Sequence, residues 1–401
     1  MRFAEISVPA IRHNIATLRR HTRAGVIVVV KANAYGHGAD IVAPAVIDAG
    51  ASMVAVASLE EAIALRGDGF AAPILCWLHA EHLDYAEAVR HRIQPGISGA
   101  GQLRRLARAA GEAGVRASVQ LKLDTGLSRN GAAPTAWEEL FAAAAAAERA
   151  GQLCVTGVFS HLANAGDAED RAQAARFDAG VRMLRAHGVA APLRHLAASA
   201  AALTSPHLSY DAVRLGLAAY GLSPGQDSGA AALDLRPAMT FATEVLSLRR
   251  VAAGAGVSDG FEHTCTSDAL LAQLPVGFGD GIPRALSGTG AAVTIGGERA
   301  PIVGRIAMDE CVVDVSHLAG RIRVGDRTVL FGDPALGEPA VEEWSARLGT
   351  INYEVVSRVG ARVRRVVVDR GHPPRETPIH FSLAQPGREI SVPDRSPAIL
   401  S

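Results

Sequence analysis

The chain has 401 residues, of which 49% are apolar, and its formal net charge is zero. This length suffices for about two globular domains, and the neutral charge balance argues against nucleic acid or an anionic membrane as an obligate partner. No run of about 18 uncharged apolar residues is present to span a membrane, and the first residues lack the apolar core of a signal peptide, so we expect a cytoplasmic protein.

Short apolar runs alternate with helical stretches between residues 20 and 225. Repeated strand–helix units require parallel strands, and eight of them can close into a barrel. An open, doubly wound sheet is less favoured, because no Gly-x-Gly-x-x-Gly turn follows the first run. We therefore predict an α/β fold with a (β/α)8 barrel of the TIM type over residues 1–230. The predicted strands are Val26–Ala32, Met53–Ser58, Ala72–Leu78, Ile93–Ser98, Ala117–Asp124, Cys154–His161, Pro192–Ser199 and Ala212–Gly221.

The pattern changes after a Gly/Ser/Ala/Asp segment at Pro224–Arg236, which is typical of a linker. Strand-like runs separated by glycine turns then dominate, with one helix expected near Val341–Leu348. We predict a mainly antiparallel β domain over residues 235–370 and an irregular tail over residues 371–401, which are rich in Pro, Arg and Ser. The predicted strands are Phe241–Val251, Ala269–Val276, Ala291–Ile295, Ala300–Val303, Cys311–Val315 and Arg327–Phe331.

Reactive residues gather at the carboxyl ends of the predicted barrel strands. In a closed parallel barrel the loops at that end converge on one face, where active sites are built. Lys31 ends the first run with an apolar wall behind it, so desolvation can lower its pKa and free its amine for Schiff-base chemistry. The other residues placed in this way are Lys122, Asp124, Arg129, His161, Ser199 and Arg214.

Lys31 and the loops after the last two barrel strands together suggest pyridoxal 5′-phosphate (PLP) as the cofactor. Those loops are the usual phosphate cradle of a barrel, and the Ser199 hydroxyl beside a glycine-flanked backbone suits a phosphate dianion. Arg214 is the best-placed partner for the pyridine nitrogen, and an arginine cannot accept the proton of that nitrogen. The ring would then be a weak electron sink, which suits a reaction that removes one α-proton and returns it.

No metal is expected, because the sequence has no His-Glu-x-x-His pattern or comparable ligand cluster. Four cysteines lie far apart without Cys-x-x-Cys spacing, and we interpret them as small buried side chains in a reducing compartment. They are Cys76, Cys154, Cys265 and Cys311.

Over residues ~1–370, several motifs together resemble those of the alanine racemase family, whose members are fold-type III PLP enzymes. The run Val30–Gly38 is similar to the PLP-lysine signature of the family. The resemblance implies an isomerase that interconverts L- and D-alanine or a similar small amino acid. The other matching segments are Lys122–Gly126 with Arg129, Val213–Leu217 with Tyr220 and Gly221, Pro301–Arg305 with Met308 and Asp309, and Ile351–Glu354.

The resemblance also implies roles for individual residues. Lys31 would hold PLP as a Schiff base and act as the base for the D-enantiomer. Arg214 would face the pyridine nitrogen, with His161 beneath the ring as its support. Arg129 would contact the substrate carboxylate or the cofactor hydroxyl, positioned by Lys122, which is often carbamylated in this family. The residues implied to bind phosphate are Tyr35, Ser199, Gly216, Leu217 and Tyr353.

The family forms a head-to-tail homodimer in which the β domain of one chain completes the active site of the other. The resemblance therefore implies that residues after about 240 act in trans. Among them, the backbone N–H of Met308 would help to hold the substrate carboxylate.

The sequence departs from the family at the second catalytic base. A tyrosine in a Val-x-Tyr-Gly turn usually serves the face of the substrate opposite the lysine, and Asp259 stands at that position here. A solvated aspartate is ionised and donates protons poorly, although burial could raise its pKa. Asp259 or the nearby His263 is therefore the candidate for the second base. Further departures are Ala198, Phe278 and Glu310, where the family usually has Asn, Tyr and a neutral residue.

Three functions stay open at this stage. The first is a racemase of alanine or a similar small amino acid. The second is a PLP enzyme of the same fold with a one-base reaction, such as retro-aldol cleavage, hydroxymethyl transfer or epimerisation of a larger amino acid, which the altered turn motivates. The third is a PLP-carrying protein without catalysis, which the presence of a full second domain disfavours.

Overall fold

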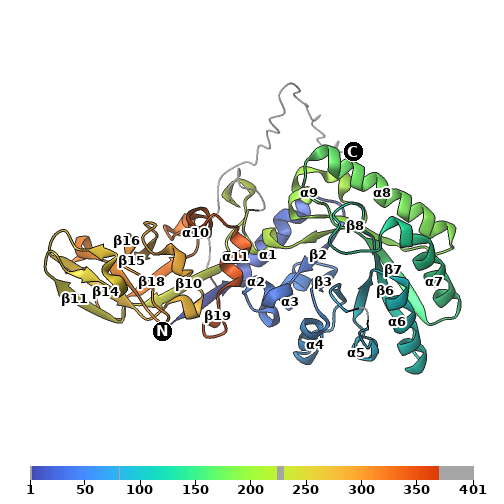
Figure 1. Ribbon diagram of the computed structural model, residues 1–401, viewed down its shortest axis with the longest axis horizontal. Coiled ribbons are helices and arrows are strands. Elements are labelled where there is room, and N and C mark those ends of the chain that lie inside the picture. The colour runs from blue at the N-terminus through green and yellow to red at the C-terminus, as the bar shows by residue number, and fades with distance from the viewer. Residues whose placement is uncertain (1, 81, 224–229, 370–401) are drawn as a thin grey trace, which may run out of the picture.

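The computed structural model describes residues 2–80, 82–223 and 230–369. Figure 1 shows two lobes along the long axis of the molecule, a barrel and a β domain, with α1 (Val8–Arg20), α2 (Lys31–Tyr35) and α11 (Asn352–Ser357) between them. The tail expected over residues 371–401 and part of the expected linker lie outside the described residues. Among the described helices, none is long and apolar enough to cross a membrane.

Eight parallel strands close into a barrel, which confirms the predicted fold class. The last strand pairs with the first through Gly25 and Ala212, so the sheet has no free edge. The strands are rich in apolar residues that are buried on both faces, because helices cover the outside. The strands are β2 (Gly25–Val29), β3 (Met53–Val56), β4 (Ile74–Cys76), β5 (Gln94–Ile97), β6 (Ala117–Lys122), β7 (Leu153–Phe159), β8 (Leu193–Ala198) and β9 (Ala212–Leu215).

The helices that surround the barrel follow from local sequence signals. Leu103, Leu106 and Ala110 recur at helical spacing and are buried against the barrel. Ser58 and Glu61 form a capping box that starts the helix after β3. The remaining barrel helices are α3 (Ala39–Asp48), α4 (Leu59–Gly67), α5 (Ala86–Arg90), α6 (Ala100–Glu112), α7 (Trp137–Arg149), α8 (Asp167–Ala186) and α9 (Ser199–Thr204).

The β domain is built on a nine-stranded, mainly antiparallel sheet, as the sequence predicts. The helix predicted at Val341–Leu348 is α10 (Val341–Leu348), and the hairpin β12 (Gly256–Val257)–β13 (His263–Thr264) forms a separate two-stranded sheet. The strands in sheet order are β11 (Ser247–Val251), β14 (Ala269–Leu274), β17 (Cys311–Asp314), β16 (Glu298–Val303), β15 (Ala292–Ile295), β18 (Arg327–Phe331), β10 (Met239–Glu244), β1 (Phe3–Ser7) and β19 (Arg364–Val368).

The single strand expected at Phe241–Val251 is in fact two strands. β10 pairs with β18 and β1, whereas β11 pairs with β14 at the far edge of the sheet. The chain changes neighbours at Val245 and Leu246, whose N–H groups donate to Asp326 and Gln273. Apolar and polar residues are mixed on both sides of this point and no Gly or Pro marks it, so the sequence pattern does not reveal the break.

The first residues of the chain belong to the β domain, although the sequence assigned residues from 1 onward to the barrel. β1 lies between β10 and β19, and Ala4 and Ile6 are buried in that sheet. At Ser7 the chain turns into α1, where the Ser7 hydroxyl accepts a hydrogen bond from the Ala10 N–H at 3.2 Å. A strand of five residues carries too little alternation to identify its distant partners.

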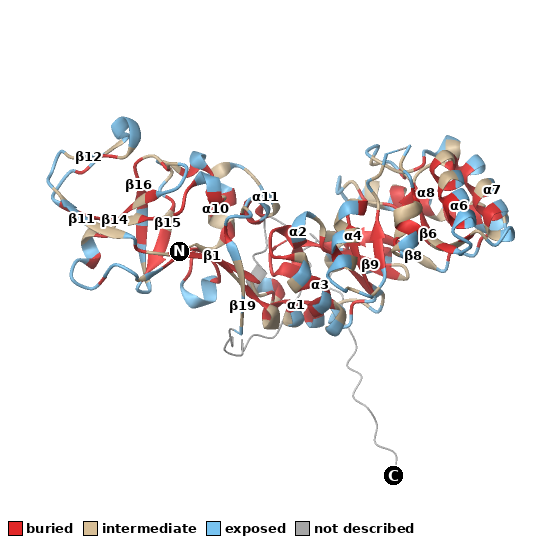
Figure 2. Ribbon diagram, turned by 90° about the horizontal axis from the view of Figure 1, so that it is seen from below, coloured by how far each residue is buried: buried red, intermediate tan, exposed pale blue. Residues whose placement is uncertain are grey.

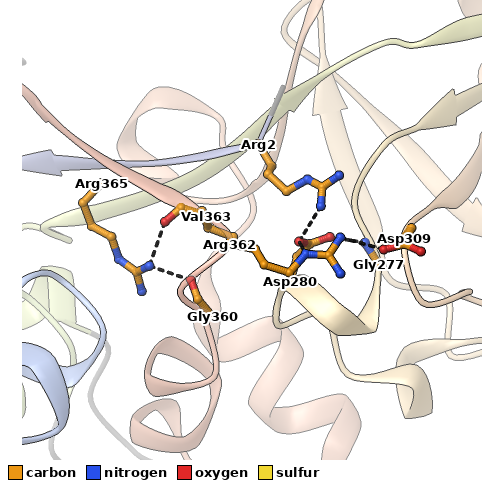
Figure 3. Close-up of polar contacts among 8 residues, drawn as sticks. All are labelled: Arg2, Gly277, Asp280, Asp309, Gly360, Arg362, Val363 and Arg365. Carbon is orange, nitrogen blue, oxygen red and sulfur yellow. Dashed lines mark hydrogen bonds and ion pairs between the residues drawn. The ribbon is translucent and has the colours of Figure 1, made fainter.

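A buried carboxylate fixes both ends of the described chain to the β domain (Figure 3). Asp280 has no exposed surface, and it accepts hydrogen bonds from Arg2 at 2.8 Å and from the Gly277 N–H at 3.1 Å. Arg362 forms an ion pair with Asp280 at 3.1 Å and with Asp309 at 2.6 Å. A buried carboxylate needs such partners, so this cluster stabilises one arrangement of the loop that contains it.

Candidate active site

A cavity of about 290 Å³ opens at the carboxyl ends of the barrel strands. Lys31 follows β2, Lys122 ends β6, Ser199 follows β8 and Gly216 follows β9, so the barrel brings together residues that are far apart in sequence. The cavity is lined by Val29, Lys31, Tyr35, Trp77, Lys122, Arg129, Phe159, His161, Asn164, Ala198, Ser199, Ala200, Arg214, Gly216 and Tyr353.

Lys31 and Lys122 are the only lysines among the 401 residues, and both line this cavity. Burial, and secondarily the charge of Arg129, lowers the pKa of Lys31, while Glu61 opposes the shift. Burial lowers the pKa of Lys122 to about 8, and the charges of Arg214 and Arg129 add to this effect. The site therefore favours uncharged amines, which are nucleophiles and bases.

The turn that follows Lys31 has an unusual backbone. Ala32, Asn33, Ala34 and Tyr35 have φ between 51° and 54°, so four consecutive residues are left-handed. Such a conformation costs about 1–2 kcal/mol per residue, and surrounding contacts must hold it in place. The side chain of Asn33 accepts a hydrogen bond from the Ala39 N–H at 2.8 Å, which closes the turn from within.

The β domain supports this turn from outside. A Cβ on Gly36 would lie 2.4 Å from the carbonyl oxygen of Val356 in α11, so only glycine permits this packing. The Arg365 Nε–H donates to the carbonyl oxygen of Gly36 at 2.9 Å, and Arg365 is itself held by the carbonyl oxygens of Gly360 and Val363 (Figure 3). The position of Lys31 therefore depends on both domains.

A small pocket floor is formed where Ser199, Gly216 and Tyr35 meet. The Gly216 N–H donates to the Ser199 hydroxyl at 3.0 Å. A Cβ on Gly216 would lie 2.5 Å from the Tyr35 hydroxyl oxygen, so the absence of a side chain leaves room there. Burial raises the pKa of Tyr35 and of Tyr353, whose ring centroids lie 5.7 Å apart, so both phenols keep their O–H donors. Neutral donors around a glycine fit the phosphate of PLP.

The Gly216→Ala substitution should weaken PLP binding by about 10- to 100-fold, because an overpacked site typically costs about 1–3 kcal/mol. The new methyl group would displace the Tyr35 ring. Fluorescence titration of the apoprotein with PLP measures the dissociation constant. The Gly67→Ala substitution is a matched control, because a Cβ at Gly67 meets no atom within 4 Å. Equal affinities for both variants would exclude Gly216 from the cofactor site.

Arg214 is the buried cation of the cavity. Its Nη2 donates to the Ser160 carbonyl oxygen at 2.7 Å and contacts His161 Nδ1 at 3.0 Å, and its Nη1 contacts His195 Nδ1 at 2.9 Å. These contacts use the two terminal nitrogens and leave the Nε–H as a donor for the cavity. Burial lowers the pKa of Arg214 to about 10, so the group stays charged near neutral pH.

His161 is held as a neutral hydrogen-bond acceptor for Arg214. Burial, followed by the charge of Arg214, lowers the pKa of His161 to about 3. Because Arg214 can only donate, the ring proton of His161 lies on Nε2. The arrangement fits a PLP ring that meets an arginine and not a carboxylate at its nitrogen.

Asp259 and His263 do not line the cavity of their own chain. Both belong to the β12–β13 hairpin, which Figure 2 shows at the end of the β domain away from the barrel. Asp259 is exposed, His263 is partly buried, and the Phe261 ring between them is 71% exposed. The neighbouring Arg305 has a raised pKa, mainly because of its ion pair with Glu262 and further because of the Asp259 charge.

Two other expected site residues also lie outside the lining. Met308 belongs to the β domain and is 55% exposed. Leu217 directly follows Gly216 and its side chain is buried, so only its backbone is available to a ligand. The expectation that all residues after about 240 act in trans is wrong for Tyr353, which lines the cavity of its own chain because α11 packs against α2.

Sequence reasoning missed several lining residues. Trp77 and Phe159 lie near the carboxyl ends of predicted strands, and an aromatic residue at that position could have indicated that it lines the cavity. Asn164 has φ of 54° in a loop, which no local pattern reveals. Among the residues that the structure describes, no group of three His, Cys, Asp or Glu side chains is placed to hold a metal ion.

The chain matches family models over most of its length. The model of the alanine racemase N-terminal domain matches residues 6–224, and that of the C-terminal domain matches residues 238–367. The alanine racemase of Frankia casuarinae is 43% identical over 367 residues, which are 90% of this chain and 95% of the relative. That of Mycolicibacterium smegmatis is 42% identical over 371 residues, which are 91% and 94% of the two chains.

Solved structures of alanine racemases share both domains. The structure from D-cycloserine-producing Streptomyces lavendulae has 42% sequence identity and a TM-score of 0.87, and the match covers 92% of this chain and 97% of the other. The structure from Bartonella henselae, which has covalently bound pyridoxal phosphate, has 27% identity and a TM-score of 0.80 over 92% and 99% of the two chains.

Proposed function

This chain belongs to the alanine racemase family and is an amino-acid racemase, and from that premise we propose that its substrate is alanine and its cofactor PLP. The observation that carries the proposal is the pairing of Lys31 with Arg214 in one cavity. A lysine with a lowered pKa is suited to covalent attachment and to proton transfer. An arginine in place of a carboxylate suits removal and return of a single α-proton.

PLP fits the residues around the cavity. Lys31 would hold it covalently, Arg214 would meet its ring nitrogen, and His161 would support Arg214 from beneath. The phosphate would bind to Tyr35, Ser199, Gly216, the backbone of Leu217, and Tyr353. When bound, PLP withdraws electron density from the α-carbon of an amino acid and so lowers the barrier to loss of the α-proton.

The chain's own residues supply the proton transfer on one face of the substrate. The amine of Lys31 accepts the α-proton of the D-enantiomer, because its lowered pKa leaves it uncharged more often than a solvated lysine. Arg129 lies on the exposed side of the cavity and would hold the substrate carboxylate. The rings of Trp77 and Phe159 add apolar surface to the lining of the cavity.

The second face requires a second subunit. The hairpin with Asp259 lies far from the cavity of its own chain, so a homodimer is the arrangement in which Asp259 of the partner subunit completes the site. Three large apolar side chains that are exposed on the β domain support such an interface, because a partner subunit would cover them. They are Phe261, Phe278 and Met308. Met308 would contribute its backbone N–H, and His263 is the alternative second base.

Lys122 is the proposed site of carbamylation. Only an uncharged amine reacts with CO2, and a pKa of about 8 makes that form abundant near neutral pH. The resulting anion would lie near the cations of Arg129 and Arg214, which stabilise it.

The carbamate should give a signal in ¹³C NMR of protein exposed to ¹³C-labelled CO2. At constant dissolved CO2 the signal should increase as the pH rises through about 8, because the amine loses its proton there. The signal should be absent from the Lys122→Arg variant and present in the Lys31→Arg variant. The α-amino group of the chain can also form a carbamate, and the double variant Lys31→Arg/Lys122→Arg identifies its signal. Since the chain has no other lysine, any additional signal that survives in Lys122→Arg would contradict the assignment.

A one-base reaction of the same fold is the second candidate function. The observation in its favour is that the exposed Asp259 stands where the family usually has a tyrosine as its second base. Such an enzyme would perform retro-aldol cleavage, hydroxymethyl transfer or epimerisation of a larger amino acid.

The experiment that separates these functions is a panel of amino acids incubated with the holoenzyme in deuterated buffer and followed by ¹H NMR. We expect the α-proton of both alanine enantiomers to exchange. Exchange or cleavage of a larger or β-hydroxy amino acid, with alanine inert, would establish the second function. A panel without any exchange would contradict both and favour a cofactor carrier.

A further inference from the structure

A line of polar side chains runs inside the barrel from the cavity toward the opposite end. Arg214 Nη1 contacts His195 Nδ1 at 2.9 Å, and His195 Nε2 contacts Gln120 Oε1 at 2.7 Å. Gln120 Nε2 then donates to Gln94 Oε1 at 3.2 Å. Gln120 and His195 have no exposed surface. Residues on four strands, β5, β6, β8 and β9, take part.

The direction of these hydrogen bonds follows from the chemistry of arginine. A guanidinium has donors only, so His195 Nδ1 must present its lone pair to Arg214. The proton of the neutral ring is then on Nε2, which donates to the Gln120 carbonyl oxygen. The Gln120 amide group in turn donates to Gln94. Every donor in the line points away from Arg214, so the bonds strengthen one another.

The interior of a parallel barrel is usually filled by branched apolar side chains. A buried amide or imidazole costs free energy unless its hydrogen bonds are made, so this line is not explained by packing. The His195 ring is stacked on Phe159, with ring centroids 4.8 Å apart and planes 6° from parallel. This stacking fixes the plane of the ring but does not determine which ring nitrogen carries the proton. Arg214 requires an unprotonated Nδ1, and Gln120 supplies the acceptor that the buried Nε2–H then needs.

We propose that Gln120 is a positioning residue that fixes His195 as the neutral Nε2–H tautomer and, through His195, aligns the Arg214 guanidinium with the cavity. A carboxamide is suited to this task because it accepts a hydrogen bond without a charge. A carboxylate at the same place would stabilise the imidazolium, and that form would turn an N–H and a positive charge toward the guanidinium. The expected effect of this alignment on catalysis rests on the proposed function, whereas the assignment of the His195 tautomer does not.

The test compares the Gln120→Glu and Gln120→Met variants with the matched control Gln102→Glu. Gln102 is a buried glutamine of α6 that accepts a hydrogen bond from the Ser98 N–H at 2.9 Å and is outside the barrel interior. The first readout is the ¹⁵N chemical shift of His195 in protein with labelled histidine, assigned by the signal lost in His195→Gln. The second is the absorbance maximum of bound PLP, and the third is kcat and KM for alanine.

In the wild type and in Gln102→Glu we expect one protonated and one unprotonated ring nitrogen. Gln120→Glu should protonate both nitrogens, shift the PLP absorbance and lower kcat by about 10-fold with little change in KM, which is the lower end of the effect of losing a supporting partner. If Gln120→Glu fails to fold, Gln120→Met removes the acceptor at similar volume. It should leave the Nε2–H without a hydrogen bond, which moves the Nε2 chemical shift, and it should also shift the PLP absorbance.

Unchanged His195 shifts in the folded Gln120 variants would overturn the proposal, as would unchanged PLP absorbance despite altered shifts. If the predicted shifts appear but the wild type has no racemase activity, the proposed function fails and the tautomer assignment stands. The two failures are therefore distinguishable.

Discussion

Replacing Lys31 by alanine is expected to lower the rate of alanine racemisation by at least about 10⁴-fold, the upper end of what a positioned acid–base group contributes. The variant would lose both the covalent attachment of PLP and the base for the D-enantiomer. Chiral chromatography of the alanine formed by wild type and variant measures the effect. The left-handed turn and its contacts to α11 do not involve the Lys31 amine, so the fold should survive the change.

Because the chain contains only two lysines, the residue to which PLP is attached can be identified directly. Reduction of the holoenzyme with borohydride should fix PLP to one peptide, and only Lys31 and Lys122 are available. We expect the label on the Lys31 peptide in the wild type and in the control variant Lys122→Arg. A label on Lys122, or activity that persists in Lys31→Ala, would contradict the assignment of the two lysines.

The Asp259→Asn substitution is expected to lower the conversion of L-alanine to D-alanine by about 10²–10⁴-fold, because it removes the proposed second base and keeps the shape of the side chain. Exchange of the α-proton of D-alanine with deuterium should continue, since Lys31 serves that face alone. ¹H NMR in deuterated buffer follows both reactions in one sample.

Two further substitutions in the same turn complete this test. Glu262→Gln is the matched control, because Glu262 pairs with Arg305 on the surface and should leave both rates nearly unchanged. His263→Gln tests the alternative base. If Asp259→Asn has no effect and His263→Gln abolishes conversion of L-alanine, His263 is the second base. If neither has an effect, the second face is served by another group and the proposed role of this hairpin is wrong.

Much of the barrel and of its cavity could be predicted from the sequence. Parallel strands buried on both faces give continuous apolar runs, and each of the eight predicted runs overlaps a barrel strand. Because the carboxyl ends of parallel strands converge, Lys31, Lys122, Ser199 and Arg214 could be placed together without knowledge of any contact.

The features that were missed depend on long-range contacts. β1 belongs to the β domain because of partners more than two hundred residues away, such as Ala242 opposite Phe3. The left-handed turn after Lys31 exists because Arg365 and α11 hold it, and alanine and asparagine do not predict it locally. The tautomer of His195 depends on Arg214 and Gln120, and in sequence Gln120 is one of three polar residues that alternate with apolar ones in its strand.

We propose that one cavity with Lys31 on one face, completed by a partner subunit on the other, racemises alanine. The most direct measurement starts the purified holoenzyme separately with L-alanine and with D-alanine and follows both enantiomers by chiral chromatography. We predict that both reactions converge on equal amounts of the two enantiomers, as the equal free energies of mirror images require. Failure of either enantiomer to convert, with PLP bound at Lys31, would contradict the account.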